Sequence, residues 1–316
     1  MVPISYKASA PGTLMLLGEH AVLRNKKALV LAVDKRVHVT LTPRTDRHII
    51  INSALGIRQL NLDNLKIEQP FQFVSTAISH LKNQLSTGFE LMITSEFKED
   101  VGFGSSAAVT VATLMVLYHF MKAEIDSKHL MRVFADAKAV IQVVQGVGSG
   151  ADVAASVFGG IVLYQQNSPW VIKQWAHLLP LVAIYSGSKI PTPEVVKKVE
   201  AARQKKPEVY EKLYDSIEAC VNEAVVAIEQ EDWPLLGEIL TIQQGLMNAL
   251  GVGTPLLNRI IDKLNGHLEI FGSKISGSGL GDCVIGIGQC HSFTMAEETA
   301  VREITVRASL QGAYCE

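Results

Sequence analysis

The sequence predicts an α/β protein built as two α+β domains, the first rich in strands and the second rich in helices. Three observations favour this class. Short apolar runs of strand character fill residues 4–60, helical periodicity dominates after residue 192, and the composition shifts at S-G-S-K-I-P-T-P-E, residues 186–194. Because 316 residues suffice for two ordinary domains, we expect an N-terminal domain over 1–188 and a C-terminal domain over 189–316.

The strands of the first half are predicted from alternating and clustered apolar residues. In order, they are expected at residues 4–9, 13–17, 28–33, 37–42 and 48–52. A polar link, G-E-H-A-V-L-R-N-K-K, separates the second run from the third. Proline suits the first turn of a helix, so a helix over 71–85 is expected behind Pro70. A further strand over 89–94 leads directly into a glycine-rich loop.

The elements beyond that loop follow mainly from apolar stripes at helical spacing. Helices are expected at residues 106–123, 128–144, 193–203, 208–230, 233–250, 255–264 and 295–309. Asp126 or Ser127 is the expected N-cap of the second of these helices. Strand-like runs lie at 161–164 and 181–185, and another strand is expected after a glycine-rich turn that begins at Lys274.

Composition and charge exclude several classes of function. The formal net charge of −2 and the lack of a basic stripe argue against nucleic acid as a partner. With no signal segment and no run of about 18 apolar residues, we expect a cytoplasmic protein with no membrane partner. The four cysteines show neither metal-ligand spacing nor disulfide density. The helices over 208–250 could present a homodimer face, although core packing explains their apolar stripes equally well.

The loop V-G-F-G-S-S-A-A at residues 101–108 is the central motif of the chain. Glycine lets backbone N–H groups approach a ligand closely, and the unpaired N–H groups that open the next helix favour a phosphate. Ser105 or Ser106 could cap that helix. The alternative is a plain capped loop, and no lysine follows the glycines as in the Gly-x-x-x-x-Gly-Lys phosphate loop. The expected phosphate-binding residues are Gly102, Phe103, Gly104, Ser105, Ser106, Ala107 and Ala108.

Two further small-residue clusters accompany this loop. The first reads A-P-G-T-L-M-L-L-G-E-H-A-V and the last K-I-S-G-S-G-L-G-D-C, with G-S-G-A-D lying between the loop and the last cluster. In order and spacing over nearly the whole chain, the set resembles the GHMP kinase superfamily. The resemblance implies an N-terminal domain like ribosomal protein S5 domain 2, a ferredoxin-like C-terminal domain, and ATP bound in the cleft between them. It also implies Mg²⁺ and a small-molecule alcohol as the phosphoryl acceptor.

The resemblance assigns roles to individual residues. Asp152 occupies the position of the family's catalytic aspartate, which accepts or orients the proton of the acceptor hydroxyl. Ser106 would reach the metal, and Glu19 is a second metal candidate. The alternative for Asp152 is the N-cap of a helix within G-S-G-A-D-V-A-A. The residues expected to contact the acceptor are Glu19, His20, Ser149, Thr192, Gly277 and Ser278.

Two positions depart from the pattern of mevalonate kinases in this superfamily. Their lysine after A-P-G is replaced by Thr13, and their glutamate eleven residues before the catalytic aspartate is replaced by Ile141. Magnesium needs few protein ligands, so Ser106 and the ATP phosphates could suffice, with weaker metal binding. Lys189 and Arg24 are candidates for the missing cation, although a solvated surface role is the favoured reading for both.

The branch of the superfamily follows from shorter matches. G-E-H-A-V and L-M-N-A-L-G-V-G-T-P-L-L look most like mevalonate kinases, which implies transfer of the γ-phosphoryl group of ATP to mevalonate in isoprenoid precursor synthesis. G-S-G-A-D and G-D-C look closer to phosphomevalonate kinases, whose phosphorylated acceptor calls for fixed cations in the pocket. A nucleotide binder that has lost catalysis is a further alternative, although a pure binder has no need of Asp152.

Overall fold

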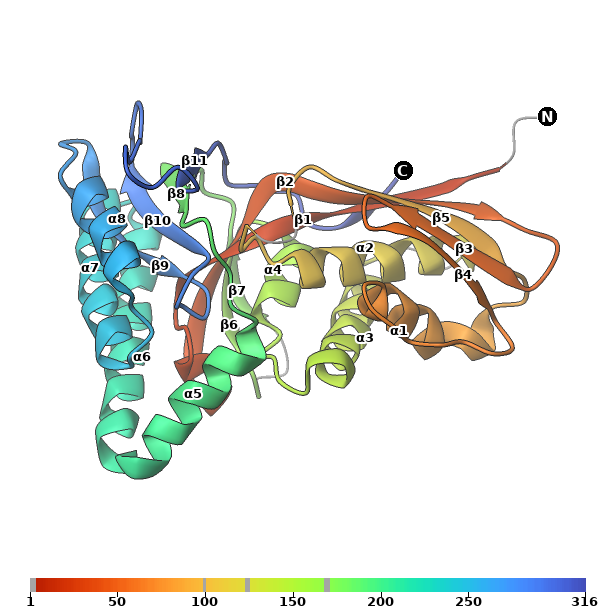
Figure 1. Cartoon of the computed structure of the whole chain (residues 1–316), viewed down its shortest axis with the longest axis horizontal. Coiled ribbons are helices and arrows are strands. Elements are labelled where there is room, and N and C mark those ends of the chain that lie inside the picture. The colour runs from red at the N-terminus through yellow and green to blue at the C-terminus, as the bar shows by residue number, and fades with distance from the viewer. Residues whose placement is uncertain (1–3, 99–100, 123–125, 168–170) are drawn as a thin grey trace.

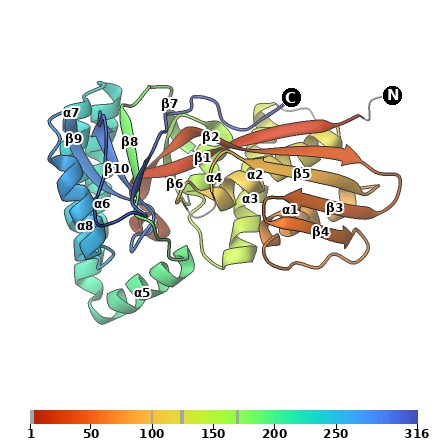
Figure 2. The same ribbon diagram turned by 45° about the horizontal axis from the view of Figure 1, so that its top comes forward.

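The computed structural model describes residues 4–98, 101–122, 126–167 and 171–316 and contains two β-sheets with helices packed on each. In Figures 1 and 2 the first sheet extends along the length of the molecule, and the second sheet with its helices covers one end. None of the helices in the described residues combines the length and the apolar character needed to cross a membrane. The mixed α/β class predicted from the sequence is confirmed.

The first sheet has eight strands, of which β1 and β2 are the longest. The strands are β1 Tyr6–Leu17, β2 Lys27–Pro43, β3 His48–Ser53, β4 Gly56–Asn61, β5 Phe89–Ser95, β6 Ile161–Gln165, β7 Val171–Trp175 and β12 Tyr314–Cys315. The main path runs β12-β1-β2-β5-β3-β4, while β6 pairs with β2 and β7. The β3–β5 pair is parallel and the other pairs are antiparallel.

Two helices pack directly on this sheet, α2 Ser105–Phe120 and α4 Ala151–Phe158, and two more pack on α2, namely α1 Gln72–Leu81 and α3 Ser127–Gln145. A short 3₁₀ turn, η2 Lys82–Gln84, follows α1. The side chains of α2 are almost all buried from Ala107 to Tyr118, because β1, β2, α1 and α3 surround it. This buried helix holds the glycine loop at its N-terminus in the middle of the molecule (Figure 1). Asp126 caps α3 as expected, accepting a hydrogen bond from the His129 N–H at 2.9 Å.

The second sheet is antiparallel, in the order β11-β8-β10-β9. Its strands are β8 Leu181–Tyr185, β9 Ile270–Ser276, β10 Cys283–Gly288 and β11 Arg302–Ile304. The helices of this half are α5 Thr192–Lys205, α6 Pro207–Glu229, α7 Trp233–Ala249 and α8 Pro255–Asn265. Of these, α7 and α8 pack on β9 and β10, and α6 packs on α7 and reaches β1 and β2.

The long strands β1 and β2 join the two halves. Successive side chains of a strand point to opposite faces, so Leu14 and Leu16 enter the core shared with Ile285 of the second sheet. Met15, between them, enters the core beneath α2 instead. Both faces of this end of the sheet are therefore buried.

Several predicted elements differ from the structure. The two strands expected at 4–9 and 13–17 form the single strand β1, and those at 28–33 and 37–42 form β2. The helix expected over 295–309 is wrong, since this segment forms turns followed by the short strand β11. Its alanine and glutamate residues favour a helix, but pairing with the open edge of β8 overrides that local preference. Sequence reasoning also did not predict β7.

Two strands pair across the predicted division at residue 188. β8 precedes it but belongs to the second sheet, and β12, at the end of the chain, pairs with β1 in the first sheet. The division into domains stays a prediction.

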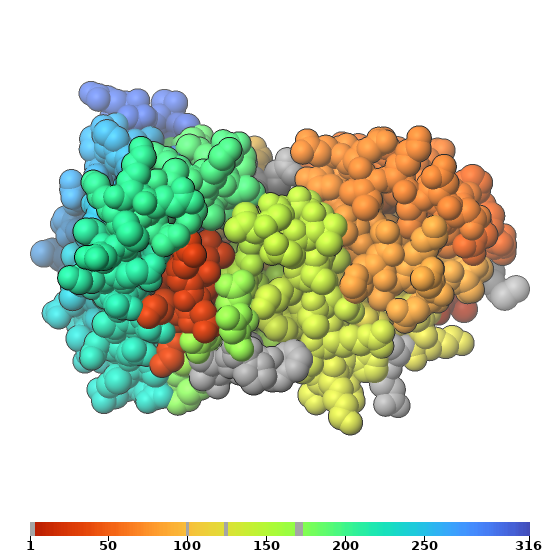
Figure 3. All heavy atoms as spheres, turned by 90° about the horizontal axis from the view of Figure 1, so that it is seen from below, coloured from red at the N-terminus to blue at the C-terminus, as the bar shows by residue number. Residues whose placement is uncertain are grey.

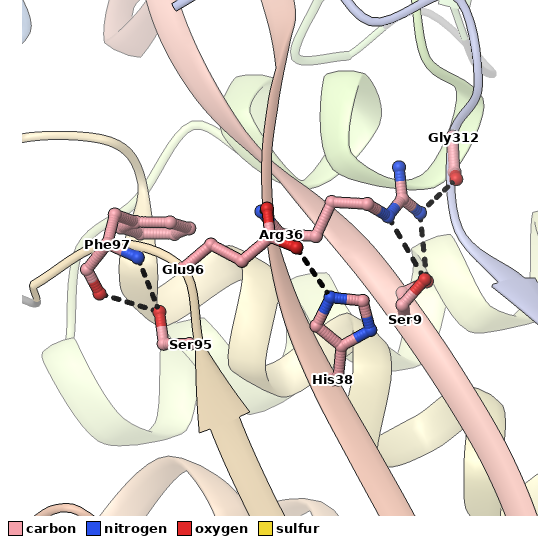
Figure 4. Close-up of polar contacts among 7 residues, drawn as sticks. All are labelled: Ser9, Arg36, His38, Ser95, Glu96, Phe97 and Gly312. Atoms are coloured by element: carbon pink, nitrogen blue, oxygen red, sulfur yellow. Dashed lines mark hydrogen bonds and ion pairs between the residues drawn. The ribbon is translucent and has the colours of Figure 1, made fainter. Parts of the chain in front are cut away.

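The returning C-terminal segment is held by Arg36, which is buried (Figure 4). Its guanidinium donates to the carbonyl oxygens of Gln311 at 3.2 Å and Gly312 at 2.7 Å, and to the Ser9 hydroxyl at 3.0 Å. Gly312 lies so close to α4 that a Cβ there would meet the Val157 carbonyl oxygen at 2.1 Å. The segment is therefore fixed between the first sheet and α4.

Candidate active site

The glycine loop before α2 is held in a conformation that favours glycine. Gly102 and Gly104 have φ angles of 78° and 59°, in the left-handed region that other residues rarely adopt. A Cβ on Gly104 would lie 2.1 Å from the Thr13 hydroxyl oxygen. Gly104 is the N-cap of α2, and the helix has no side-chain cap. The expectation that Ser105 or Ser106 caps α2 is therefore wrong, because both serines lie inside its first turn.

This loop opens on a cavity of about 590 Å³ that residues from all three small-residue clusters line. The elements around it meet on the face drawn in Figure 3, where the turn between β1 and β2 (red) lies between α5 (green) and α3 (yellow-green). Of the predicted site residues, those lining the cavity are Glu19, His20, Gly102, Gly104, Ser105, Ser106, Ala107, Ser149, Asp152, Thr192, Gly277 and Ser278.

Two residues of the predicted phosphate loop do not line the cavity. The Phe103 side chain is fully buried in the core shared by the two halves, where it contacts Phe97 with ring centroids 5.8 Å apart. Its carbonyl oxygen accepts a hydrogen bond from the Thr13 N–H at 3.0 Å. Ala108 is fully buried beneath the first sheet. Both residues hold the loop in place rather than present side chains to a ligand.

Asp152 faces this cavity from the first turn of α4. The N-cap of α4 is Gly150 rather than Asp152, so the alternative that Asp152 only caps a helix is wrong. Its Oδ1 accepts a hydrogen bond from the Thr13 hydroxyl at 2.9 Å. Burial raises the pKa of Asp152, while the Thr13 hydrogen bond and the positive charge of Lys189 act to lower it. Ser149 supports the start of α4, because its hydroxyl accepts from the Ala151 N–H at 3.1 Å.

The two candidate cations of the sequence lie in different places. Arg24 pairs with Glu200 and is not among the residues that line the cavity. Lys189 is exposed but does line the cavity, together with both Asp152 and Asp282. Among the described residues that line it, Lys189 is the one lysine or arginine. The predicted surface role therefore fits Arg24 better than Lys189.

A buried charged network supports the turn that carries Glu19. The Glu19 carboxylate accepts hydrogen bonds from Lys274 through Oε1 and from Gln243 through Oε2. Both Glu19 and Lys274 are almost completely buried. Burial raises the pKa of Glu19 and lowers that of Lys274, and their mutual attraction opposes both shifts. Because both of its oxygens are engaged, Glu19 is a weaker candidate for the metal site than Ser106.

His20 links the same turn to the last glycine cluster. Its Nε2 lies 2.8 Å from the carbonyl oxygen of Ser278. Since a carbonyl only accepts, Nε2 must carry the proton. Burial lowers the pKa of His20, so the ring is neutral near pH 7 and Nδ1 has no proton. Beside it, the buried Ser278 hydroxyl has no hydrogen-bond partner within the described protein. A bound molecule could satisfy this hydroxyl.

Asp282 is a cavity residue to which sequence reasoning gave no role, although the G-D-C motif contained it. The residue is buried, with φ 64°, and its Oδ1 has no hydrogen-bond partner within the described protein. Burial raises its pKa to about 6, a shift that Lys189 opposes and Asp152 reinforces. A Cβ on Gly102 would lie 2.9 Å from the Asp282 Cβ. Asp282 therefore lies directly against the glycine loop.

The place of the expected metal-binding glutamate is apolar. Ile141 lies on α3, is buried in the core and reaches the cavity wall. Within the described residues there is no group of three or more histidine, cysteine, aspartate or glutamate side chains able to hold a metal. The Ser106 hydroxyl, at the start of α2, supplies an oxygen donor of the kind that magnesium prefers.

A second cavity of about 630 Å³ adjoins the first and is more apolar. The two cavities share four lining residues, namely Gln72, Phe73, Ser105 and Ser106. Glu96 lies on the wall of the second cavity, where Figure 4 shows it beside His38. Its carboxylate lies 3.0 Å from His38 Nε2 and accepts from the Arg36 N–H at 3.1 Å. Partial burial acts to raise the pKa of Glu96, but these hydrogen bonds lower it overall.

Two parts of the chain match the N-terminal and C-terminal domains of one known family, in that order. Residues 72–160 match the family described as GHMP kinases N terminal domain, and residues 224–305 match GHMP kinases C terminal. The mevalonate kinase of Archaeoglobus fulgidus is 36% identical over 282 residues, covering 89% of this chain and 91% of that protein. The mevalonate kinase of Pyrococcus abyssi is 30% identical over 301 residues, covering 88% and 87%.

Solved structures share the fold over nearly the full length. A mevalonate kinase crystal structure superposes with a TM-score of 0.78 at 24% identity, covering 96% of this chain and 99% of that one. The phosphomevalonate kinase of Streptococcus pneumoniae, in complex with phosphomevalonate and AMPPNP, gives a TM-score of 0.75 at 18% identity, covering 97% and 99%. At these identities the structural matches establish the fold alone.

Proposed function

The chain belongs to the GHMP kinases and is a phosphotransferase, and from this premise we propose that it transfers the γ-phosphoryl group of ATP to the hydroxyl of mevalonate. The observation that carries the proposal is the single cavity in which Asp152, the glycine loop and the turn of Glu19 and His20 meet. The acceptor follows from the similarity to curated mevalonate kinases at 30–36% identity over most of the chain.

In this proposal, the glycine loop binds the phosphates of ATP and the second cavity binds its adenosine. The N-terminus of α2, with its backbone N–H groups and the positive end of the helix dipole, attracts the phosphates. The N-cap of α2 is Gly104, and no side-chain hydrogen bond caps the helix. The second cavity, continuous with the loop through Ser105 and Ser106, takes the adenosine. An apolar pocket with a few polar groups suits a purine base.

The acceptor alcohol lies on the other side of the loop. Its polar groups meet the unpartnered Ser278 hydroxyl and the unprotonated Nδ1 of His20. Ser149, Thr192 and Gly277 complete this side of the cavity. The buried pair of Glu19 and Lys274 keeps the turn rigid, because each partner would be costly to leave unpaired.

Asp152 acts on the acceptor hydroxyl. As the bond from the acceptor oxygen to the γ-phosphorus forms, the bond from that phosphorus to the β–γ bridging oxygen breaks and its electron pair leaves with ADP. The hydroxyl proton passes to the Asp152 carboxylate. Burial raises the pKa of Asp152, which strengthens its carboxylate as a base, while the Thr13 hydrogen bond and the charge of Lys189 oppose that rise.

Magnesium fits the Ser106 hydroxyl, since an oxygen donor beside the phosphates is what this ion requires from the protein. When bound, Mg²⁺ neutralises negative charge on the phosphates. Ile141 has no oxygen donor to offer the metal. We therefore expect phosphate oxygens and water to supply most of the ligands of Mg²⁺ besides Ser106.

Phosphomevalonate is the second candidate acceptor, favoured by the G-S-G-A-D and G-D-C motifs. A phosphorylated acceptor calls for several fixed cations. Among the described residues lining the cavity, Lys189 is the single lysine or arginine, which favours the unphosphorylated acceptor. Arg24, the other candidate cation, lies outside this cavity and forms an ion pair with Glu200.

A coupled assay of ADP release tests the proposal. The purified protein is incubated with Mg-ATP and either mevalonate or 5-phosphomevalonate. Turnover with mevalonate alone is the expected result. Turnover with 5-phosphomevalonate alone overturns the choice of acceptor, and nucleotide binding without turnover of either compound identifies a binder that has lost catalysis.

A further inference from the structure

More acidic than basic side chains line the cavity. Asp152 and Asp282 both line it, and the triphosphate proposed to enter it is also anionic. The position after A-P-G, where the family resemblance expects a lysine, holds the neutral Thr13. Charge at a phosphoryl-transfer site must be neutralised for both binding and transfer. A protein cation that assists Mg²⁺ in this neutralisation must therefore come from another position in the chain.

We propose that Lys189 supplies this cation, placing its ammonium group against the transferred phosphoryl group and the Asp152 carboxylate, an inference that rests on the proposed phosphoryl transfer. Lys189 enters the same cavity as Asp152 from the opposite half of the molecule. Its charge acts on both carboxylates, lowering the pKa of Asp152 and of Asp282 relative to burial alone. Its ammonium group donates N–H groups to phosphoryl oxygens.

The backbone that carries Lys189 is fixed by the last glycine cluster. The Asp282 N–H donates to the Ser188 carbonyl oxygen at 2.8 Å, and the Ser186 N–H donates to the Asp282 carbonyl oxygen at 2.9 Å. Gly281 approaches so closely that a Cβ there would lie 2.8 Å from the Ser188 oxygen. These contacts hold the segment between β8 and α5 beside the glycine loop, where both ribbon views place it (Figures 1 and 2).

The geometry explains how a lysine from another element can replace one on β1. The stem of lysine is long and flexible, and its ammonium is a compact charge that needs no fixed fork geometry. Lys189 is exposed and lines the cavity, and the length of its stem lets the head group reach phosphates that enter there. Thr13 meanwhile donates its hydroxyl to Asp152. The two roles of the expected lysine, orienting the aspartate and neutralising phosphate, are thus divided between Thr13 and Lys189.

The test compares Lys189→Met and Lys189→Arg with Lys198→Met, which removes the same charge from an exposed position of α5 outside the cavity. Titration calorimetry measures the Kd of MgADP with and without aluminium fluoride, which mimics the transferred phosphoryl group. We expect Lys189→Met to weaken the aluminium fluoride complex by on the order of 10²-fold, with a much smaller loss for MgADP alone. Lys189→Arg should retain most of the affinity, and Lys198→Met should match the wild type.

A second readout is the pH dependence of kcat/KM. Loss of Lys189 removes an attraction that favours ionised Asp152, so its pKa rises and the acid limb moves to higher pH. Wild-type affinity for the aluminium fluoride complex in Lys189→Met, or equal losses in the Met and Arg variants, would overturn the role of Lys189. A wild-type enzyme that turns over neither acceptor refutes the proposed function instead, and the calorimetric comparison still decides the lysine.

Discussion

The Thr13 hydroxyl lies 2.9 Å from Asp152 Oδ1 and donates a hydrogen bond to it. The same hydroxyl would lie 2.1 Å from a Cβ on Gly104, so it fills the space between the glycine loop and the aspartate. A neutral donor here orients one carboxylate oxygen, which leaves the other oxygen to meet the acceptor. Thr13 is almost completely buried, and water cannot readily replace its hydrogen bond.

Thr13→Val removes this hydrogen bond while preserving the shape of the side chain. The bond stabilises ionised Asp152, so its loss raises the pKa of Asp152 and moves the acid limb of kcat/KM to higher pH. We expect a fall in kcat of roughly tenfold, the equivalent of a hydrogen bond to a charged group. Thr113→Val is the matched control, since Thr113 is a buried threonine that donates to the Val109 carbonyl within α2. An unshifted pH profile in Thr13→Val contradicts the prediction.

Asp152→Ala removes the proposed base. We expect kcat to fall by roughly 10²–10⁴-fold, the usual contribution of a positioned general base, while the Kd for ATP stays nearly unchanged. Steady-state kinetics and nucleotide titration measure the two quantities. Asp63→Ala, an exposed aspartate paired with Arg47 away from the cavity, serves as control. Activity retained at the wild-type level would reduce Asp152 to a structural role in α4.

Lys274→Met leaves the Glu19 carboxylate buried without its cationic partner. Removing one partner of a buried pair typically costs about 3–5 kcal/mol, and we expect a loss of this size in the free energy of unfolding measured with urea. The double variant Glu19→Gln/Lys274→Met removes the unpaired charge and should regain much of that loss. If the single and double variants are equally stable, the two side chains do not form an ion pair in the folded protein.

Asp282→Asn tests the pH dependence that follows from a buried carboxyl group. Its pKa is raised to about 6, so the folded protein binds this proton more tightly than the unfolded chain, and wild-type stability falls as pH rises through about 4 to 6. The asparagine variant has no carboxyl group at this position and therefore lacks this pH-dependent change in stability. It should therefore gain up to about 3 kcal/mol over the wild type above pH 6 and almost nothing near pH 4.

Urea unfolding at several pH values measures the difference between these two proteins. Asparagine tolerates the left-handed backbone of position 282, so the substitution adds little strain. Asp262→Asn provides the control, because Asp262 is an exposed carboxylate on α8. A stability difference that does not change with pH contradicts the prediction for Asp282.

The sequence predicted those parts of the site that depend on local backbone chemistry. The loop at Gly102 and Gly104 was recognisable because only glycine readily takes their positive φ angles. The role of Asp152 came instead from the resemblance to the GHMP kinase superfamily, because its own small-residue cluster fits a helix cap equally well. Most of the strands and helices followed from apolar periodicity, and family similarity then confirmed the class of enzyme.

The missing parts depend on contacts between distant segments. Lys274 and Gln243 meet Glu19 across 255 and 224 positions of sequence, and no local pattern signals such a meeting. Asp282 acquires its raised pKa only when folding buries it against Gly102. The segment over 295–309 has helical composition but forms β11, because the edge of β8 offers backbone hydrogen bonds.

The pairing of β12 with β1 in the first sheet affects when that sheet can be completed during protein synthesis. Arg36 is synthesised early, yet two of the carbonyl groups that satisfy its guanidinium belong to Gln311 and Gly312. Until Gln311, Gly312 and β12 have emerged from the ribosome, the first sheet lacks β12 and Arg36 lacks these acceptors. The N-terminal half therefore cannot complete its native structure until this late-synthesised segment is available to pair with it.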